Sequence, residues 1–189
     1  MTPQEERDLS DENYGLLFDI RRSIRYHTRR AAFFTSWHLV TNILTVLMAG
    51  SFLFDLGKSG DPVWWLKALS AVAALLAAAD IALQYSTRAS IHNRLSGRFS
   101  DLEIKILRGP ADGTEWQQYR EDRLIIERDE PAIFKVLDLL CRNELLSASG
   151  RTRENSPAEF FYPTLLQRVT CQVLRWEDID PYDNRPPKI

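Results

Sequence analysis

Cysteine, histidine and the motifs of known enzyme classes are scarce in this sequence. The 189 residues include two cysteines, Cys141 and Cys171, and three histidines. The two cysteines form no metal-binding or redox spacing, so reduced structural thiols are expected. The sequence has no phosphate-binding glycine loop, no paired-glycine dinucleotide fingerprint, no zinc-protease motif and no nucleophile elbow. We therefore expect no enzyme activity, no catalytic residues, no metal site and no cofactor.

A strong excess of one charge is also missing. The net charge of -2 gives no argument for a nucleic-acid partner. Charged residues make up 26% of the chain, and the mean hydropathy is -0.28. These averages hide a partition, because nearly all of the charge lies outside residues 31–85. The sequence therefore predicts an apolar anchor joined to a larger soluble part.

The apolar part contains two segments that resemble membrane spans. The run from Ala31 to Phe54 has no Asp, Glu, Lys or Arg, and as a helix it would cover roughly 36 Å, against a hydrocarbon core of about 30 Å. The second segment, Val63 to Tyr85, has a shorter uncharged centre and contains Asp80, a carboxylate that is costly in a membrane and therefore a candidate functional group. Residues 55–62 between them are rich in turn formers. The pattern predicts a two-span helical hairpin.

Basic residues flank both ends of this hairpin, whereas its tip carries one Lys and two Asp. Because basic flanks stay on the cytoplasmic side when helices insert, we expect both termini in the cytoplasm and an uncleaved anchor. Attraction to anionic lipid is worth about 1 kcal/mol per basic residue, and a topology signal explains the basic run without a nucleic acid or an anionic nucleotide as ligand. The arginines expected to lie near the lipid are Arg21, Arg22, Arg25, Arg29, Arg30 and Arg88.

Polar side chains recur at helical steps through the first span. A pore lining needs such a stripe, but polar groups also join helices inside closed membrane bundles, and both interpretations stay open. The candidate pore-lining or interhelical residues are Thr35, His38, Thr41, Asn42, Thr45 and, from the second span, Asp80. His38 and Asp80 have comparable depths in an antiparallel hairpin. We therefore expect the two groups to interact, within or between subunits, or to share an aqueous cavity.

Small residues form a ridge along the second span, where they would let two helix backbones approach closely. The ridge consists of Ser70, Ala74, Ala78 and Ala82. Its partner is either the first span of the same chain or a neighbouring copy, and the sequence does not separate these alternatives. The other two histidines, His27 and His92, are expected to be ordinary polar or interfacial groups rather than ligands.

The rest of the chain predicts helices and no strands. Ile91, Leu95, Phe99, Leu102 and Ile106 share one helical face. The predicted helices cover residues 84–107, 114–128 with a capping box at its start, and 129–150 with a cap at Asp129 or Glu130 and an exit at Gly150. A further short helix can start at Ser156, Pro157 and Glu159, where Pro163 would limit or kink it, and an amphipathic stretch covers 165–176.

We divide the chain into four parts on this basis: a basic cytoplasmic helix over 1–30, the transmembrane hairpin over 31–85, a cytoplasmic helical region over 86–150, and a C-terminal extension over 151–189. The predicted fold class is all-α, an integral membrane helical hairpin with amphipathic cytoplasmic helices that form a bundle.

This layout resembles the SLATT family, the two-span effector domains associated in bacteria with second-messenger nucleotidyltransferases and SLOG sensor domains. The resemblance covers roughly residues 20–150. It rests on a basic helix (RRSIRYHTRR), two spans with a tight turn, an amphipathic helix (RASIHNRLSGRFSDLEIKIL) and a late stretch (IERDEPAIFKVLDLLCRNEL). It implies a homo-oligomeric effector of the bacterial inner membrane that opens a pore in a conflict or antiviral response, with a nucleotide-signalling or sensor protein as a candidate partner.

The sequence thus favours a self-assembling, pore-forming membrane effector that is controlled through its cytoplasmic helices. Two alternatives stay open. The first is a non-conducting membrane anchor or scaffold, and the second is a soluble helical assembly protein whose hydrophobic hairpin is buried between subunits.

Overall fold

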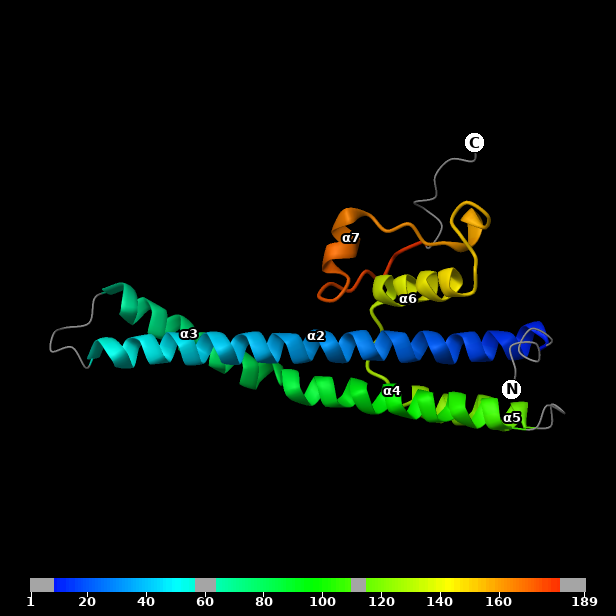
Figure 1. Cartoon of the computed structure of the whole chain (residues 1–189), viewed down its shortest axis with the longest axis horizontal. Coiled ribbons are helices and arrows are strands. Elements are labelled where there is room, and N and C mark those ends of the chain that lie inside the picture. Colours follow the sequence, from blue (N-terminus) through cyan, green and yellow to red (C-terminus); the bar gives the residue numbers. More distant parts are fainter. Residues whose placement is uncertain (1–8, 57–63, 110–114, 181–189) are drawn as a thin grey trace. The chain divides into compact units, whose positions relative to one another are not determined.

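The computed structural model describes residues 9–56, 64–109 and 115–180, and the regular structure in these ranges is helical (Figure 1). The elements are α2 (Asp11–Leu56), α3 (Trp64–Leu83), α4 (Tyr85–Arg108), α5 (Trp116–Glu127), α6 (Lys135–Ala148), the 3-10 turn η1 (Pro157–Glu159) and α7 (Leu165–Thr170). The all-α prediction is confirmed. By length and composition, α2 and α3 belong to two helical stretches that are apolar and long enough to cross a membrane.

The chain forms two compact units. The hairpin unit comprises Arg30–His92, and the helical unit comprises Met1–Arg29 together with Asn93–Ile189. Helices α2 and α4 each contribute residues to both units.

Helix α2 begins at a conventional N-terminal cap. The Ser10 hydroxyl accepts a hydrogen bond from the Asn13 amide at 3.3 Å, and Asp11 and Glu12 place negative charge at the positive end of the helix dipole. The helix then runs without interruption to Leu56. The basic helix and the first apolar span predicted from the sequence are therefore parts of a single helix.

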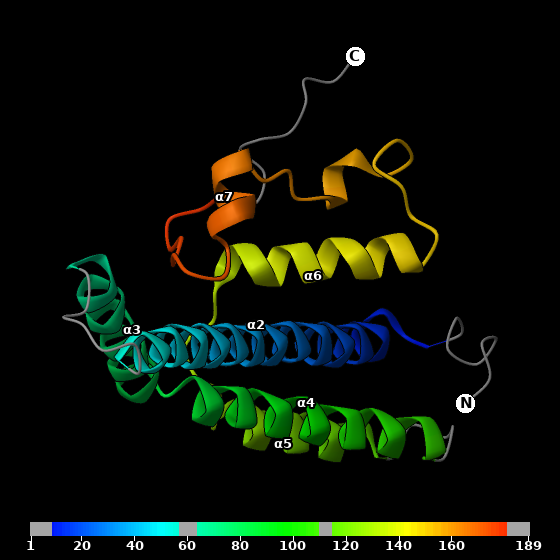
Figure 2. The same cartoon turned by 60° about the vertical axis from the view of Figure 1, so that its left-hand side comes forward.

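Within the helical unit, the N-terminal half of α2 lies between α6 on one side and α4 with α5 on the other (Figures 1 and 2). The predicted apolar face of α4 is buried at four of its five positions, and Ile91 is the exception at 37% exposure. These four residues pack against α2 and α5. The resulting core consists of Leu16, Leu17, Ile20, Leu95, Phe99, Leu102, Ile106, Trp116, Tyr119 and Ile126.

A second core joins α6 to Tyr26 of α2 and to the segment after α6. Its buried members are Tyr26, Val136, Leu137, Leu139, Cys141, Phe161, Cys171 and Ile179. Both cysteines are buried thiols that form no disulfide with each other, and burial raises the pKa of the Cys141 thiol to about 12. A thiol with so high a pKa stays protonated at neutral pH and behaves as a small apolar group.

The hairpin unit is held together by a seam with the spacing of a left-handed coiled coil. From Phe34 to Ser51 of α2, the buried and half-buried positions are Phe34, His38, Thr41, Thr45 and Met48, which alternate steps of four and three residues. On α3 the most buried residues are Leu66 and Ala73, seven apart, and the half-buried Asp80 follows after another seven.

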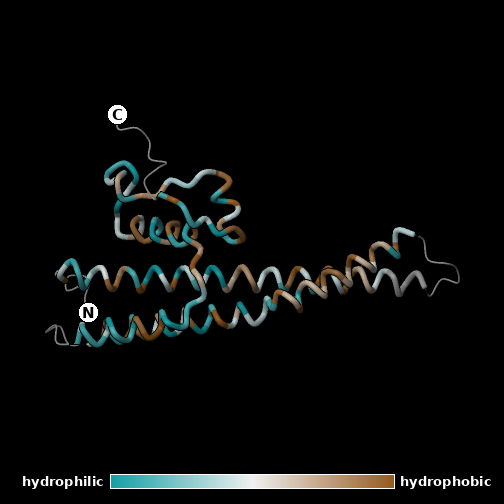
Figure 3. Tube along the Cα trace, turned by 180° about the vertical axis from the view of Figure 1, so that it is seen from behind, coloured by the Kyte–Doolittle hydropathy of each residue, from teal (hydrophilic) through white to brown (hydrophobic). Residues whose placement is uncertain are grey.

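Away from this seam, the hairpin exposes large apolar side chains. Val46, Leu75 and Ile81 are 70%, 69% and 77% exposed, and Figure 3 shows the hydrophobic colouring that runs along α3. The apolar windows of the two helices are 17% and 11% buried. The core helix of a soluble protein would instead bury most of its apolar residues.

The ends of several helices differ from the predictions. Gln84 interrupts the helical path between α3 and α4 with a φ of 50°, a left-handed conformation that costs a residue with a side chain roughly 1–2 kcal/mol. Helix α6 begins at Lys135, after Phe134, with no side-chain cap, so the predicted cap at Asp129 or Glu130 is wrong. Gly150 has a φ of 83° and lies after the helix end, as predicted.

Glu130 does not cap α6 because its carboxylate binds a histidine instead. Its Oε1 lies 3.0 Å from His27 Nε2, and the imidazole, 1% exposed, stacks on Phe99 with 5.8 Å between ring centres. His92 is also buried, at 4% exposure. Both histidines are therefore buried polar groups, and an interfacial position, one of the two alternatives expected for them, is wrong.

The C-terminal extension contains less helix than predicted. Helix α7 has a complete capping box between Thr164 and Gln167 but ends at Thr170, because the chain then turns and the indole of Trp176 donates to the Thr170 hydroxyl at 3.2 Å. The predicted short helix near residue 157 is present as η1. The predicted start at Thr114 and most of the predicted turn over 55–62 lie outside the described residues.

One buried amide holds the C-terminal extension to α6. The Asn143 side chain donates to the Phe161 carbonyl at 2.6 Å and accepts from the Phe161 amide at 2.9 Å. We predict that Asn143→Leu lowers the free energy of unfolding by about 1–3 kcal/mol, because two buried backbone groups lose their partner. Denaturant unfolding of the detergent-solubilised protein measures this loss. The exposed Asn155 provides the control, and equal stability of Asn143→Leu and Asn155→Leu would contradict the prediction.

Candidate functional site in the apolar hairpin

An ionisable pair lies between the two helices of the hairpin unit. Nδ1 of His38 on α2 is 3.0 Å from Oδ2 and 3.1 Å from Oδ1 of Asp80 on α3. The His38 side chain is 38% exposed and that of Asp80 is 17% exposed. The predicted interaction between these residues is therefore confirmed, and it occurs within one chain.

The Asn42 amide lies beside the imidazole. It comes one turn after His38, and its side-chain nitrogen is 3.2 Å from His38 Nε2 and 3.5 Å from Nδ1. A nitrogen so close to both ring nitrogens lies over the ring. We call His38, Asn42 and Asp80 the polar trio.

The other members of the predicted polar stripe have different surroundings. Thr41 is 4% exposed, and its hydroxyl donates to the carbonyls of Trp37 at 2.9 Å and of His38 at 3.0 Å, within its own helix. Thr45 is half-buried on the seam, and Thr35 is exposed. The structure thus brings His38, Asn42 and Asp80 together and leaves the threonines outside this trio.

Most of the small-residue ridge of α3 lies off the seam. Ser70 is half-buried and its hydroxyl donates to the Leu66 carbonyl at 2.9 Å. Ala74, Ala78 and Ala82 are exposed. Because α3 uses the face of Leu66 and Asp80 toward α2, these three alanines have no packing role within the hairpin unit. Their predicted contact with a neighbouring copy stays a prediction.

A cation–aromatic cluster that sequence reasoning missed surrounds Phe34. The Arg30 guanidinium carbon lies 4.6 Å from the Phe34 ring centre, and the Arg88 carbon lies 5.9 Å from it. His92 stacks on the same ring, with centres 5.8 Å apart and planes 15° apart. Tyr85, Arg88 and His92 follow helical steps of three and four on α4, a signal that was present in the sequence. Arg30 and Arg88 therefore bind an aromatic ring as well as flanking the apolar segments.

The remaining arginines of the basic run belong to the helical unit, and most of them bind carboxylates there. Arg21 donates to Glu103 of α4 at 2.6 Å, and Arg29 binds Glu144 of α6. Arg22 Nε lies 3.1 Å from Asp138 Oδ1, and its Nη1 lies 3.2 Å from Asp19. Proximity of these arginines to lipid stays a prediction, while their ion pairs within the protein were not foreseen.

Comparisons with known proteins add no relative to this description. No family model matches the chain, and no curated protein or solved structure matches it. Among the described residues, no group of three or more His, Cys, Asp or Glu side chains has an arrangement that could hold a metal ion.

The Arg22 partner Asp138 gives a pH prediction. Burial raises the pKa of the Asp138 carboxyl above its ordinary value, nearby Asp19 and Glu130 act in the same direction, and Arg22 opposes them. Protonation of Asp138 is therefore more favourable in the folded state than in the unfolded state. Asp138 contributes stability that is fully present below the ordinary aspartate pKa and is lost as the pH rises through the raised value.

We therefore expect Asp138→Asn to gain stability relative to the wild type as the pH rises from acidic to neutral. Denaturant unfolding of both proteins at several pH values in this window measures the difference. Asp101→Asn, at an exposed position of α4, should show no such trend. A stability difference between Asp138→Asn and the wild type that does not change with pH would contradict the assignment.

The geometry of the hairpin gives a second prediction. Cysteines that replace His38 and Asp80 should form a disulfide within one chain under mild oxidation, because the two side chains meet across the seam. The pairs 36/80 and 38/82, each shifted by two residues, should cross-link much less, since the shift turns one side chain away by about 200°. Mobility on non-reducing gels reports the bond. Equal cross-linking of all three pairs would show that the helices have no fixed register.

Proposed function

We propose that this protein is a membrane effector that self-assembles and forms a pore. The observation that carries the proposal is the His38–Asp80 pair, with Nδ1 and Oδ2 3.0 Å apart between the apolar segments of α2 and α3. A carboxylate in a membrane span is costly, and such groups commonly mark a path for ions or protons. Together with the amide of Asn42, the pair offers hydrogen-bonding groups that can replace the hydration shell of an ion or pass a proton.

The exposed apolar surface of the hairpin unit supports placement in a membrane. Apolar side chains of this size and number are unfavourable in water. Lipid would cover them, with the basic segments and both termini on the cytoplasmic side of a bacterial inner membrane. The alternative of a soluble assembly, in which other subunits bury the hairpin, would cover the same surface. Extraction of membranes at alkaline pH separates the two, since an integral protein stays with the lipid.

Self-assembly is part of the proposal because two helices do not enclose a path. Several hairpins must surround it, and the ridge of Ala74, Ala78 and Ala82 provides an exposed strip where a neighbouring helix can approach closely. The resemblance to SLATT effectors supports the same arrangement. It also supports a role in bacterial conflict or antiviral defence, with a nucleotide-signalling or sensor protein acting on the helical unit.

A non-conducting membrane anchor is the second candidate, and one observation favours it. His38 and Asp80 satisfy each other within one chain, while Thr41 bonds to its own backbone. Polar groups that are satisfied in this way can hold a hairpin together without lining a pore. The two candidates differ in ion conductance.

Ion flux through liposomes tests the proposal. Wild-type protein should release trapped ions, and the rate should rise more steeply than linearly with the ratio of protein to lipid, because several copies form each pore. We expect Asp80→Asn to reduce the rate at least tenfold, since it removes the charge from the path, while Asp101→Asn on α4 should conduct like the wild type. An absence of flux in correctly inserted wild-type protein would favour the anchor.

A further inference from the structure

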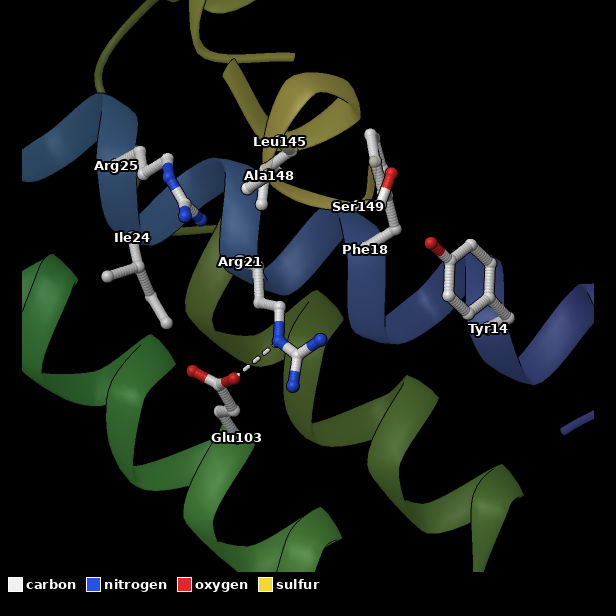
Figure 4. A pocket seen from close by; sticks show the side chains of 9 residues that line it. All are labelled: Tyr14, Phe18, Arg21, Ile24, Arg25, Glu103, Leu145, Ala148 and Ser149. Atoms are coloured by element: carbon white, nitrogen blue, oxygen red, sulfur yellow. Dashed lines mark hydrogen bonds and ion pairs between the residues drawn. The ribbon is translucent and has the colours of Figure 1, made fainter. Parts of the chain in front are cut away.

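The helical unit contains a cavity that the proposed pore does not use. Its volume is about 410 Å³, and its walls come from the N-terminal half of α2, from α4 and from the C-terminal end of α6. Figure 4 shows Arg21 of α2 pointing toward Glu103 below it, and the Arg25 guanidinium beside Ala148. All of the lining residues belong to the helical unit.

The cavity has an uncompensated positive charge. Arg21 is paired, because its guanidinium donates to Glu103 at 2.6 Å. Arg25 is half-buried and makes no hydrogen bond or ion pair in the described part of the chain. Its neighbours along α2, Arg22 and Arg29, both have carboxylate partners. Arg25 therefore stands out in this basic run as a guanidinium that lines a cavity without an anion.

The end of α6 does not account for the position of Arg25. A basic side chain beside a helix C-terminus often binds the last carbonyl groups. Here, however, the Leu145 carbonyl accepts from the Ser149 amide at 2.9 Å. The Leu146 carbonyl accepts from the Ser149 hydroxyl at 2.9 Å and from the Arg151 amide at 3.0 Å. The Arg25 guanidinium donates to none of these carbonyls in the described part of the chain.

The remaining walls combine aromatic and apolar side chains with the polar Ser149. Tyr14 and Phe18 lie one turn apart on α2, with ring centres 6.3 Å apart and planes inclined at 40°. Ile24 and Leu145 also line the cavity. Small-molecule sites commonly combine apolar walls with a few placed polar groups. Aromatic walls favour a flat or apolar ligand body, and a guanidinium favours an oxyanion that it can bind through two hydrogen bonds.

We propose that this cavity binds a small organic oxyanion that carries a flat apolar ring. Its phosphate or carboxylate group binds Arg25, and its ring lies against Tyr14 and Phe18. The proposal goes beyond the membrane function and does not depend on conductance. The same oxyanion chemistry occurs in soluble metabolites and in lipid headgroups, so the experiment has to separate these two sources.

The test uses 1-naphthyl phosphate as a fluorescent probe of the full-length protein in detergent. The wild type should bind the probe more tightly than it binds 1-naphthol or inorganic phosphate, the two parts of the probe. Arg25→Gln should weaken binding about tenfold or more, the usual effect of losing a charged hydrogen-bond partner. Arg94→Gln is the matched control, because Arg94 is exposed on α4, outside the cavity, and this variant should bind like the wild type.

A second variant controls for the possibility that Arg25→Gln misfolds. Ala148→Phe fills the cavity and keeps both arginines, so it should also abolish binding while the circular dichroism spectrum is unchanged. Phosphatidylglycerol nanodiscs identify the source: competition with the probe supports a lipid headgroup in the site, and lack of competition supports a soluble ligand. Equal binding by Arg25→Gln and Arg94→Gln, or no binding by the wild type, would overturn the proposal.

Discussion

Helix α2 carries its charges and its apolar run in separate halves, and the packing of each half follows from that separation. In the helical unit, Arg21 and Arg22 of α2 bind carboxylates of α4 and α6, and Asp19 of α2 binds Arg123 of α5 at 3.0 Å. These pairs are partly buried, so each partner needs the other to offset its desolvation. In the hairpin unit, α2 has no charged side chain after Arg30 until Asp55, and dispersion and close packing are the main forces along the seam.

Asp80 imposes the strongest local requirement on that seam. A carboxylate there needs a hydrogen-bond donor, and the spacing of four and three residues that buries Phe34 and Thr41 also brings His38 to α3. The Asn42 amide lies beside the imidazole one turn later. A small polar network of this kind fixes the register of two helices, because a shift of either helix would leave a polar group unpaired among apolar side chains.

Much of the local structure could be predicted from the sequence, because it depends on patterns within a few turns. The helical periodicity of Leu95, Phe99 and Ile106 identified the buried face of α4, and depth alone matched His38 with Asp80. Contacts between distant segments could not be predicted in the same way. Glu130 was expected to cap a helix, but the fold brings it 3.0 Å from His27, 103 residues away. The cavity beside Arg25 depends on where α6 ends against α2, a tertiary relation that no local pattern encodes.

Arg25 and His38 are residues of one uninterrupted helix, α2. A ligand bound to Arg25 would therefore act on the same element that carries the polar trio. Continuity does not by itself produce control, since an effector shifts an equilibrium only by its difference in affinity for two states. The walls of the cavity can give a ligand different affinities for two arrangements of the helices. They come from α2, α4 and α6, so a ligand that needs all three helices binds only the arrangement in which they converge, and it stabilises that arrangement by its binding free energy.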